Sequence, residues 1–197
     1  MTLREAIALF DMDGTICDYV KAMHEALEKL RAPGETFVDP FSLGDDGNNS
    51  RYKYLWDRMN LIKSEEEWWA NLPIFPLGWE VMDVAKETGY YCEILTQAPK
   101  KNPASLAGKL KWIIKHEDKL GEDIDFTITR NKSRHYGRVL VDDYPGYFMP
   151  WLEHRPKGLV IMPDSKYNKD FKDERVIRYD GTNLNQVKEV ILKAKVK

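Results

Sequence analysis

The feature that most constrains the fold is a recurring pattern in which short apolar stretches end abruptly in polar residues. Residues 6–10 are apolar without helical spacing and run directly into Asp11-Met12-Asp13-Gly14-Thr15. Similar stretches recur, separated by segments with helical spacing, at residues 91–95, 126–129, 138–141, 159–161 and 175–178. Strands that alternate with helices predict an α/β fold, in which helices cover both faces of a mostly parallel central sheet.

The connection after the first strand is far longer than the others. It extends from Cys17 to Pro76, contains segments with helical spacing and three tryptophans, and includes a polar tract at residues 44–50. A crossover between parallel strands can be as short as about a dozen residues. We therefore expect a small helical cap at residues 17–76, inserted after the first strand of a core formed by residues 1–16 and 77–197.

The charge balance and the cysteines narrow the functional classes. The formal net charge is −2. A broad nucleic-acid-binding face usually carries clustered excess Lys and Arg, so no stable nucleic-acid partner is expected.

The two cysteines, Cys17 and Cys92, have no paired spacing, which favours a reducing, cytoplasmic location. No stretch approaches the roughly 20 apolar residues that span a bilayer, so no membrane association is expected. A monomer and a homodimer both stay open.

Polar side chains follow four of the predicted strands. They are Asp11 with Asp13, Thr96, Arg130 with Lys132, and Asp142 with Asp143. The carboxyl ends of parallel strands meet at one edge of a sheet, so these side chains should gather there. Two unit charges about 4 Å apart repel by about 4 kcal/mol at an effective dielectric near 20, so four carboxylates need a cation.

All-oxygen ligands suit Mg²⁺. The sequence therefore predicts a Mg²⁺ site formed by Asp11, Asp13, Asp142 and Asp143, and leaves open whether Asp142 or Asp143 is the direct ligand.

An acidic cluster with Mg²⁺, a lysine and a hydroxyl is equipped for phosphoryl transfer. Asp11 can attack phosphorus as a carboxylate nucleophile, and Asp13 can then act as the general acid and base. Thr96 can donate a hydrogen bond to a phosphoryl oxygen, and Lys132 can offset the repulsion between the nucleophile and the phosphate. These four residues form the predicted catalytic set.

At these positions the sequence resembles the haloacid dehalogenase (HAD) phosphatases, and among them it is most similar to the 5'(3')-deoxyribonucleotidases. The stretches that carry the resemblance are Phe10-Asp11-Met12-Asp13-Gly14, Leu95-Thr96-Gln97-Ala98-Pro99-Lys100, Thr129-Arg130-Asn131-Lys132 and Leu140-Val141-Asp142-Asp143. The resemblance implies a HAD-like, Rossmannoid three-layer sandwich and hydrolysis through a phosphorylated Asp11. Gln97 departs from the pattern, because a small hydroxyl residue commonly follows the second-motif Thr, and the cap aligns only loosely.

The resemblance also implies roles in substrate binding. Gln97, Lys100 and Arg130 fall where the family binds phosphate, and Tyr19 falls where an aromatic residue packs on the base. Trp56 and the Trp68-Trp69 pair are looser candidates for the aromatic wall, and the alternative is that they form the core of the cap.

These observations predict a Mg²⁺-dependent phosphomonoesterase that hydrolyses (deoxy)nucleoside monophosphates to nucleoside and phosphate. One alternative is a HAD phosphatase acting on another small phosphate ester or on a nucleic-acid 3'-phosphate end. Another is a non-catalytic binding protein on the same fold, which the intact set of acids disfavours.

Overall fold

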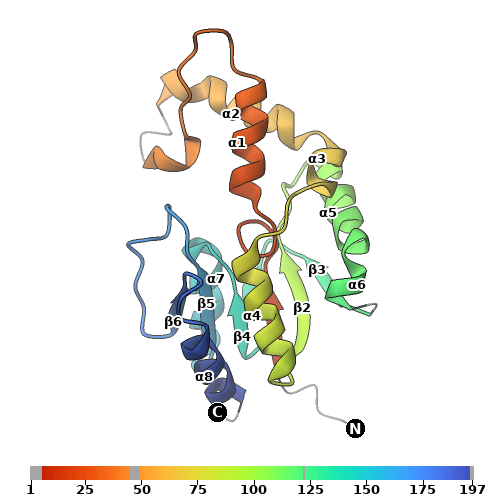
Figure 1. The fold of residues 1–197 in the computed structure, drawn as a ribbon, viewed down its shortest axis with the longest axis vertical. Coiled ribbons are helices and arrows are strands. Elements are labelled where there is room, and N and C mark those ends of the chain that lie inside the picture. Colours follow the sequence, from red (N-terminus) through yellow and green to blue (C-terminus); the bar gives the residue numbers. More distant parts are fainter. Residues whose placement is uncertain (1–5, 45–48, 122, 196–197) are drawn as a thin grey trace. The chain divides into compact units, whose positions relative to one another are not determined.

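The computed structural model describes residues 6–44, 49–121 and 123–195. Residues 1–5, at the start of the predicted core, and residues 45–48, within the predicted polar tract, lie outside the described residues. In the described part of the chain, parallel strands form one sheet in the order β3-β2-β1-β4-β5-β6 (Figure 1). The strands are β1 (Ile7–Phe10), β2 (Tyr91–Thr96), β3 (Phe126–Ile128), β4 (Val139–Val141), β5 (Leu159–Pro163) and β6 (Val176–Tyr179).

The first strand of the chain lies in the middle of this sheet. Ile7 pairs with Tyr91 on one side, and Ala8 pairs with Val139 on the other. The segments that follow β1, β2 and β4 therefore leave neighbouring strands at the same edge. This arrangement confirms the predicted parallel α/β fold, and the position of β1 puts the Asp11 loop between the two neighbouring strand ends.

Helices cover both faces of the sheet. Helices α4 (Pro76–Glu87) and α8 (Leu184–Lys195) contact each other on one face, and α7 (Pro145–Glu153) covers the other (Figure 1). A cluster of buried side chains joins α7 to the sheet: Leu9, Leu95, Leu140, Phe148, Trp151, Leu152, Val160 and Met162. The sequence pattern did not predict α7, since Pro145, Gly146 and Pro150 are poor helix formers. Pro145 occupies the first turn, where its missing N–H has no cost.

Helix α4 begins earlier than the sequence predicts. The prolines at 73 and 76 predict a linker and a helix that starts after Gly78, but Pro76 is in the first turn and Gly78 lies inside the helix. Gly78 is required there, because a Cβ at this position would lie 1.9 Å from the carbonyl oxygen of Thr15. Helix α4 thus packs directly against the backbone of the loop that follows β1.

The chain divides into two compact units, and the sheet with α4, α7 and α8 belongs to the first. The second unit consists of residues 18–73 and 98–121. Its helices are α1 (Tyr19–Lys29), α2 (Lys53–Lys63), α3 (Glu66–Ala70), α5 (Pro103–Lys115) and α6 (Glu117–Leu120), with 3₁₀ turns η1 (Pro40–Ser42) and η3 (Ser50–Tyr52). The sequence pattern predicts one helix over residues 103–119, but the structure divides it at His116 into α5 and α6.

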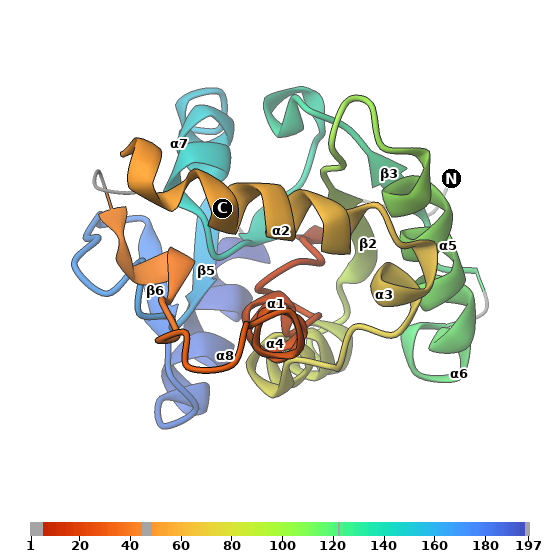
Figure 2. The same ribbon diagram turned by 90° about the horizontal axis from the view of Figure 1, so that it is seen from above.

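Close packing of α3 on α5 explains why residues 98–121 belong to the second unit, whereas the sequence-based division places them in the core (Figure 2). A Cβ on Gly108 would lie 2.4 Å from Cβ of Trp69, so the two helices approach at a glycine. The indole N–H of Trp112 donates a hydrogen bond of 2.7 Å to the Leu72 carbonyl oxygen. None of the helices in the described ranges combines the length and the apolar character that a membrane span requires.

Replacement of Gly78 by Ala should destabilise the protein by about 3 kcal/mol or more, because the clash is with backbone and cannot be relieved by a side-chain rotation. The measurement is the free energy of unfolding in urea. Gly181→Ala is the control: Gly181 has a positive φ of 90°, which helical Gly78 does not have, and its Cβ would meet only the Leu77 side chain at 3.4 Å. Its expected cost is about 1–2 kcal/mol. Equal losses for the two variants would contradict the close approach of α4 to Thr15.

Candidate active site

The loop after β1 is a tight turn that fixes the direction of Asp11. The carbonyl oxygen of Met12 accepts hydrogen bonds from the backbone N–H groups of Thr15, Ile16 and Cys17, at 3.1, 2.9 and 2.8 Å. Gly14 has a φ of 75°, a conformation that favours glycine. The backbone N–H of Asp11 donates to the Val141 carbonyl oxygen at 2.9 Å, so the β1–β4 pairing extends to the first acidic residue.

Three buried carboxylates meet at this edge of the sheet. Asp11, Asp142 and Asp143 each offer an oxygen atom, and these atoms all lie within 4.8 Å of one another. Asp11 and Asp143 are each 5% exposed, and Asp142 is fully buried. The carboxylate of Asp13, a predicted ligand from the same loop, is not part of this group.

Lys132 supplies the positive charge within the cluster. Its Nζ lies 2.6 Å from Oδ2 of Asp142, as a hydrogen bond, and 3.0 Å from Oδ1 of Asp11, as an ion pair without hydrogen-bond alignment. Burial alone would lower the pKa of Lys132, but the charges of Asp11 and Asp142 outweigh it and raise the pKa above the usual value. Lys132 is therefore a charged, buried group shared by two carboxylates.

Asp142 and Asp143, which belong to the fourth stretch of the family resemblance and are called here the motif-four pair, differ in their hydrogen-bond partners. Asp142 accepts from Lys132 and, at 2.9 Å, from the backbone N–H of Tyr144. Asp143 accepts from neutral hydroxyls, the Oγ1 of Thr15 at 3.2 Å and the phenol of Tyr167. Burial raises the pKa of Asp143 well above the usual value, and the charges of Asp142 and Asp11 add to the effect.

This set of donors fits a divalent cation. Burial raises the pKa of Asp142 to about 6 even though the charge of Lys132 opposes the shift. One lysine charge faces three buried carboxylates, so the cluster retains excess negative charge when all three are ionised. A hard cation with oxygen ligands would compensate for that charge. Asp11 shares Lys132 with Asp142, and Asp143 has no ion pair with a side chain of the described residues.

The remaining predicted residues of the first unit lie on segments that follow β2 and β3. Thr96 is fully buried at the end of β2, and its carbonyl oxygen accepts from the Thr129 N–H at 2.9 Å. Gln97 is partly exposed and Arg130 is exposed. Lys132 begins the 3₁₀ turn η4 (Lys132–Arg134), which packs against α7.

Tyr19, Trp56 and Lys100 belong to the second unit. The ring of Tyr19 packs against three other rings, with centroid distances of 6.0, 5.4 and 5.9 Å to Phe41, Trp68 and Trp69. Trp69 is buried, and its indole N–H donates to the Lys63 carbonyl oxygen at 2.8 Å, so it is part of the core of this unit. Trp56 is 38% exposed and Lys100 is exposed.

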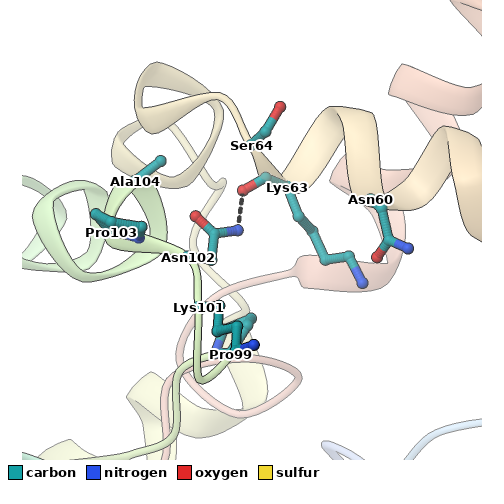
Figure 3. A pocket seen from close by; sticks show the side chains of 8 residues that line it. All are labelled: Asn60, Lys63, Ser64, Pro99, Lys101, Asn102, Pro103 and Ala104. Carbon is teal, nitrogen blue, oxygen red and sulfur yellow. Dashed lines mark hydrogen bonds between the residues drawn. The ribbon is translucent and has the colours of Figure 1, made fainter.

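A pocket of about 430 Å³ lies in the second unit (Figure 3). The end of α2 and the start of α5 form it, and Asn102 donates to the Lys63 carbonyl oxygen across it at 2.5 Å. Burial lowers the pKa of Lys63. The pocket is lined by Asn60, Lys63, Ser64, Pro99, Lys101, Asn102, Pro103 and Ala104. No predicted site residue lines this pocket; its lysine from the loop after β2 is Lys101, the neighbour of the predicted Lys100.

Two side chains with notable surroundings, Tyr167 and Lys109, were not predicted from the sequence. Tyr167 contacts the acidic cluster from the segment after β5, and its position beyond a strand end was a usable signal. Lys109 is fully buried in α5, with its ammonium 5.4 Å from the centroid of Trp69. Its signal was helical spacing, since it follows Ser105 by four residues and precedes Trp112 by three on the buried face.

Replacement of Lys132 by Met should lower the free energy of unfolding, measured in urea with EDTA, by about 3–5 kcal/mol, because Asp11 and Asp142 lose their buried cation. Adding Asp142→Asn should recover part of that loss, since one of the uncompensated carboxylates is removed. Lys193→Met, which changes an exposed lysine of α8, is the control and should have little effect. A Lys132→Met protein as stable as the wild type would contradict the proposed charge balance.

Solved structures share this fold at low sequence identity. The HAD hydrolase YfnB from Bacillus subtilis, whose structure is described as bound to magnesium, is 11% identical over 94% of this chain and 98% of its own, with a TM-score of 0.58. A HAD hydrolase of family IA, variant 3, from Entamoeba histolytica is 14% identical over 98% and 100%, with a TM-score of 0.57. These similarities confirm the HAD-like fold. A comparison with curated proteins finds no matching relative.

The family comparison goes further than the fold. The model described as "5' nucleotidase, deoxy (Pyrimidine), cytosolic type C protein" matches residues 5–197, almost the whole chain. This match confirms the resemblance drawn from the motifs at Asp11, Thr96, Lys132 and Asp142, and it identifies the protein as a nucleotidase-like phosphoric monoester hydrolase. The chain belongs to the family of cytosolic type C 5'-deoxynucleotidases, within the HAD-like phosphatases.

Proposed function

We propose that this protein is a Mg²⁺-dependent phosphatase that hydrolyses (deoxy)nucleoside monophosphates through a phosphorylated Asp11. The observation that carries the proposal is the meeting of three buried carboxylates at the carboxyl edge of the sheet, two of which are paired with one buried lysine. A phosphate dianion needs positive charge around its reacting oxygens, and the excess negative charge of this cluster calls for a further cation.

The proposed reaction has two steps. In the first, a carboxylate oxygen of Asp11 forms a bond to phosphorus as the ester P–O bond breaks, and Asp13 gives its proton to the leaving alkoxide. In the second, Asp13 accepts a proton from a water molecule whose oxygen attacks phosphorus. The bond between phosphorus and Asp11 then breaks, and inorganic phosphate is released. After the second step, Asp11 is again a free carboxylate and Asp13 is again protonated.

The charged groups of the site support these steps. Lys132 holds Asp11 by the 3.0 Å contact and would reduce its repulsion with the incoming phosphate. When bound, Mg²⁺ would neutralise phosphate charge and stabilise the charge that develops on the transferring group. Thr96, Gln97 and Arg130 are assigned to the phosphoryl oxygens, on the strength of their positions after β2 and β3 and of the family resemblance.

Asp143 is the proposed direct ligand from the motif-four pair, which the sequence left open. Asp142 already accepts from a cation and a backbone N–H, whereas the side-chain donors to Asp143 in the described ranges are uncharged hydroxyls. Asp143 therefore has more negative charge available for a metal ion. Asp11 completes the carboxylate ligands, and Asp13 is assigned to proton transfer with a further contribution to the metal site.

The nucleotide assignment rests on the family match and on the aromatic side chains of the second unit. Tyr19 is assigned to the base, Lys100 to the phosphate, and Trp56 to the aromatic wall, all by resemblance. A cytoplasmic location and the absence of a stable nucleic-acid partner are part of the same proposal. Cys17 and Cys92 are both buried and are not joined in a disulfide, which agrees with a reducing compartment.

Replacement of Asp11 by Asn should reduce phosphate release by about three orders of magnitude or more, because the amide cannot form the phosphoenzyme. The fold should persist, since the change removes one of three repelling charges. The measurement is inorganic phosphate release together with circular dichroism. Asp170→Asn, at an exposed position of the same unit, should retain full activity. Wild-type turnover by Asp11→Asn would reject Asp11 as the nucleophile.

A substrate panel should give the highest kcat/KM for deoxynucleoside monophosphates, and EDTA should abolish phosphate release until Mg²⁺ is restored in excess. The panel also includes ribonucleoside monophosphates, sugar phosphates and oligonucleotides with a 3'-phosphate. A preference for sugar phosphates or for 3'-phosphate ends would reject the nucleotide assignment but leave the phosphatase chemistry intact. Full activity in EDTA would reject the metal.

A further inference from the structure

We propose that Tyr167 is a positioning residue that holds the Asp143 carboxylate in its metal-binding orientation. The inference rests on the divalent cation of the proposed function. Tyr167 lies on the segment after β5, a part of the chain that none of the four phosphatase motifs includes. Its phenol donates a hydrogen bond to Oδ2 of Asp143, while Thr15 donates to Oδ1 at 3.2 Å.

Two hydroxyls from different segments thus hold the two oxygens of one carboxylate. A carboxylate with one donor can rotate about the Cβ–Cγ bond, whereas donors at both oxygens fix the plane of the group. The fixed orientation keeps Asp143 within 4.8 Å of the oxygens of Asp11 and Asp142. Each hydroxyl donates to one lone pair of a carboxylate oxygen of Asp143 and adds no charge. The other lone pairs of the carboxylate and its full negative charge therefore remain available to a cation.

The segment that carries Tyr167 is anchored to Asp143 itself. The neighbouring residue, Asn168, is 1% exposed, and its amide donates to the carbonyl oxygens of Asp143 at 2.9 Å and Pro163 at 3.0 Å. Its Oδ1 accepts from the Ser165 N–H at 3.0 Å and from the Arg178 guanidinium at 2.9 Å. All four hydrogen bonds hold the backbone of residue 167 at a fixed distance from the carboxylate.

The loop after β1 leaves space for this pair. A Cβ on Gly14 would lie 2.4 Å from Oδ2 of Asp143 and 2.8 Å from the phenol oxygen of Tyr167. Any side chain at position 14 would therefore push the phenol and the carboxylate apart. The positive φ of Gly14 is one reason for a glycine at this position. The short distances from its Cβ position to Tyr167 and Asp143 are a second reason.

Metal ligands are commonly oriented by hydrogen bonds from neighbouring groups, and loss of such a partner typically weakens metal affinity by about 10–100-fold. Tyr167→Phe removes the hydroxyl and keeps the ring. We expect it to raise the Kd for Mn²⁺, used as the probe, by about 10-fold. The Kd is measured on the full chain from the electron paramagnetic resonance signal of free Mn²⁺. Competition with Mg²⁺ gives the Mg²⁺ affinity, and Asp143→Asn should abolish binding.

The matched control is Tyr179→Phe. Tyr179 is likewise a tyrosine of the first unit whose phenol donates to a carboxylate, that of Glu80, but it is fully buried where Tyr167 is partly buried, and no hydrogen bond joins it to the acidic cluster among the described residues. The Tyr179→Phe variant should have the same Kd for Mn²⁺ as the wild type. In activity assays, saturating Mg²⁺ should restore the kcat of Tyr167→Phe, because the ligands themselves remain. Melting curves in EDTA check the fold, and Tyr167→Met is used if the Phe variant unfolds.

The outcomes separate the two proposals. If wild type and Tyr179→Phe bind Mn²⁺ and Tyr167→Phe binds it equally well or more tightly, the role of Tyr167 is rejected and the metal site stands. If folded wild-type protein binds no Mn²⁺, the metal of the proposed function is rejected, and the role of Tyr167 with it. Weaker binding by Tyr167→Phe alone supports the positioning role.

Discussion

The site depends on one lysine shared between two buried carboxylates. Moving a charge from water into a protein interior costs several kcal/mol per ion unless partners compensate, so Lys132, Asp11 and Asp142 are stable there only together. Their backbones come from the segments after β3, β1 and β4, which the strand order brings to one edge. The packing of η4 on α7 keeps the lysine at that edge. The single charge of this lysine can neutralise only one of the three carboxylates, and that excess of negative charge is why the site suits a divalent ion.

Much of this arrangement was predictable from sequence, for a local reason. Buried parallel strands read as uninterrupted apolar stretches, and a polar residue directly after each one marks a strand end. Asp11 and Asp142 carry that signal directly, Asp143 and Lys132 lie a few residues beyond a strand end, and the structure brings the four together. Parallel pairing alone was enough to predict a common edge, without knowledge of the strand order.

The remaining features depend on tertiary contacts that leave little trace in the local pattern. Helix α7 contains two prolines, and its stability comes from Phe148 and Trp151 packed on the sheet rather than from helix propensity. The assignment of residues 98–121 to the second unit follows from the close approach at Gly108, which periodicity does not report. Tyr167 sits in an irregular segment, where its hydrogen bond to Asp143 depends on the surrounding backbone.

The central position of β1 has a consequence for how the protein is made. A ribosome synthesises this strand first, yet Ile7 must wait for Tyr91, and Ala8 must wait for Val139, before either edge of the strand is paired. Until β2 has been synthesised, the nascent chain therefore contains an apolar strand with two open edges, and one edge stays open until β4 follows. Sheets that need such distant pairings fold slowly, and open edges can pair with other chains. Protection of residues 7–10 during synthesis is thus a requirement that the strand order imposes on the cell.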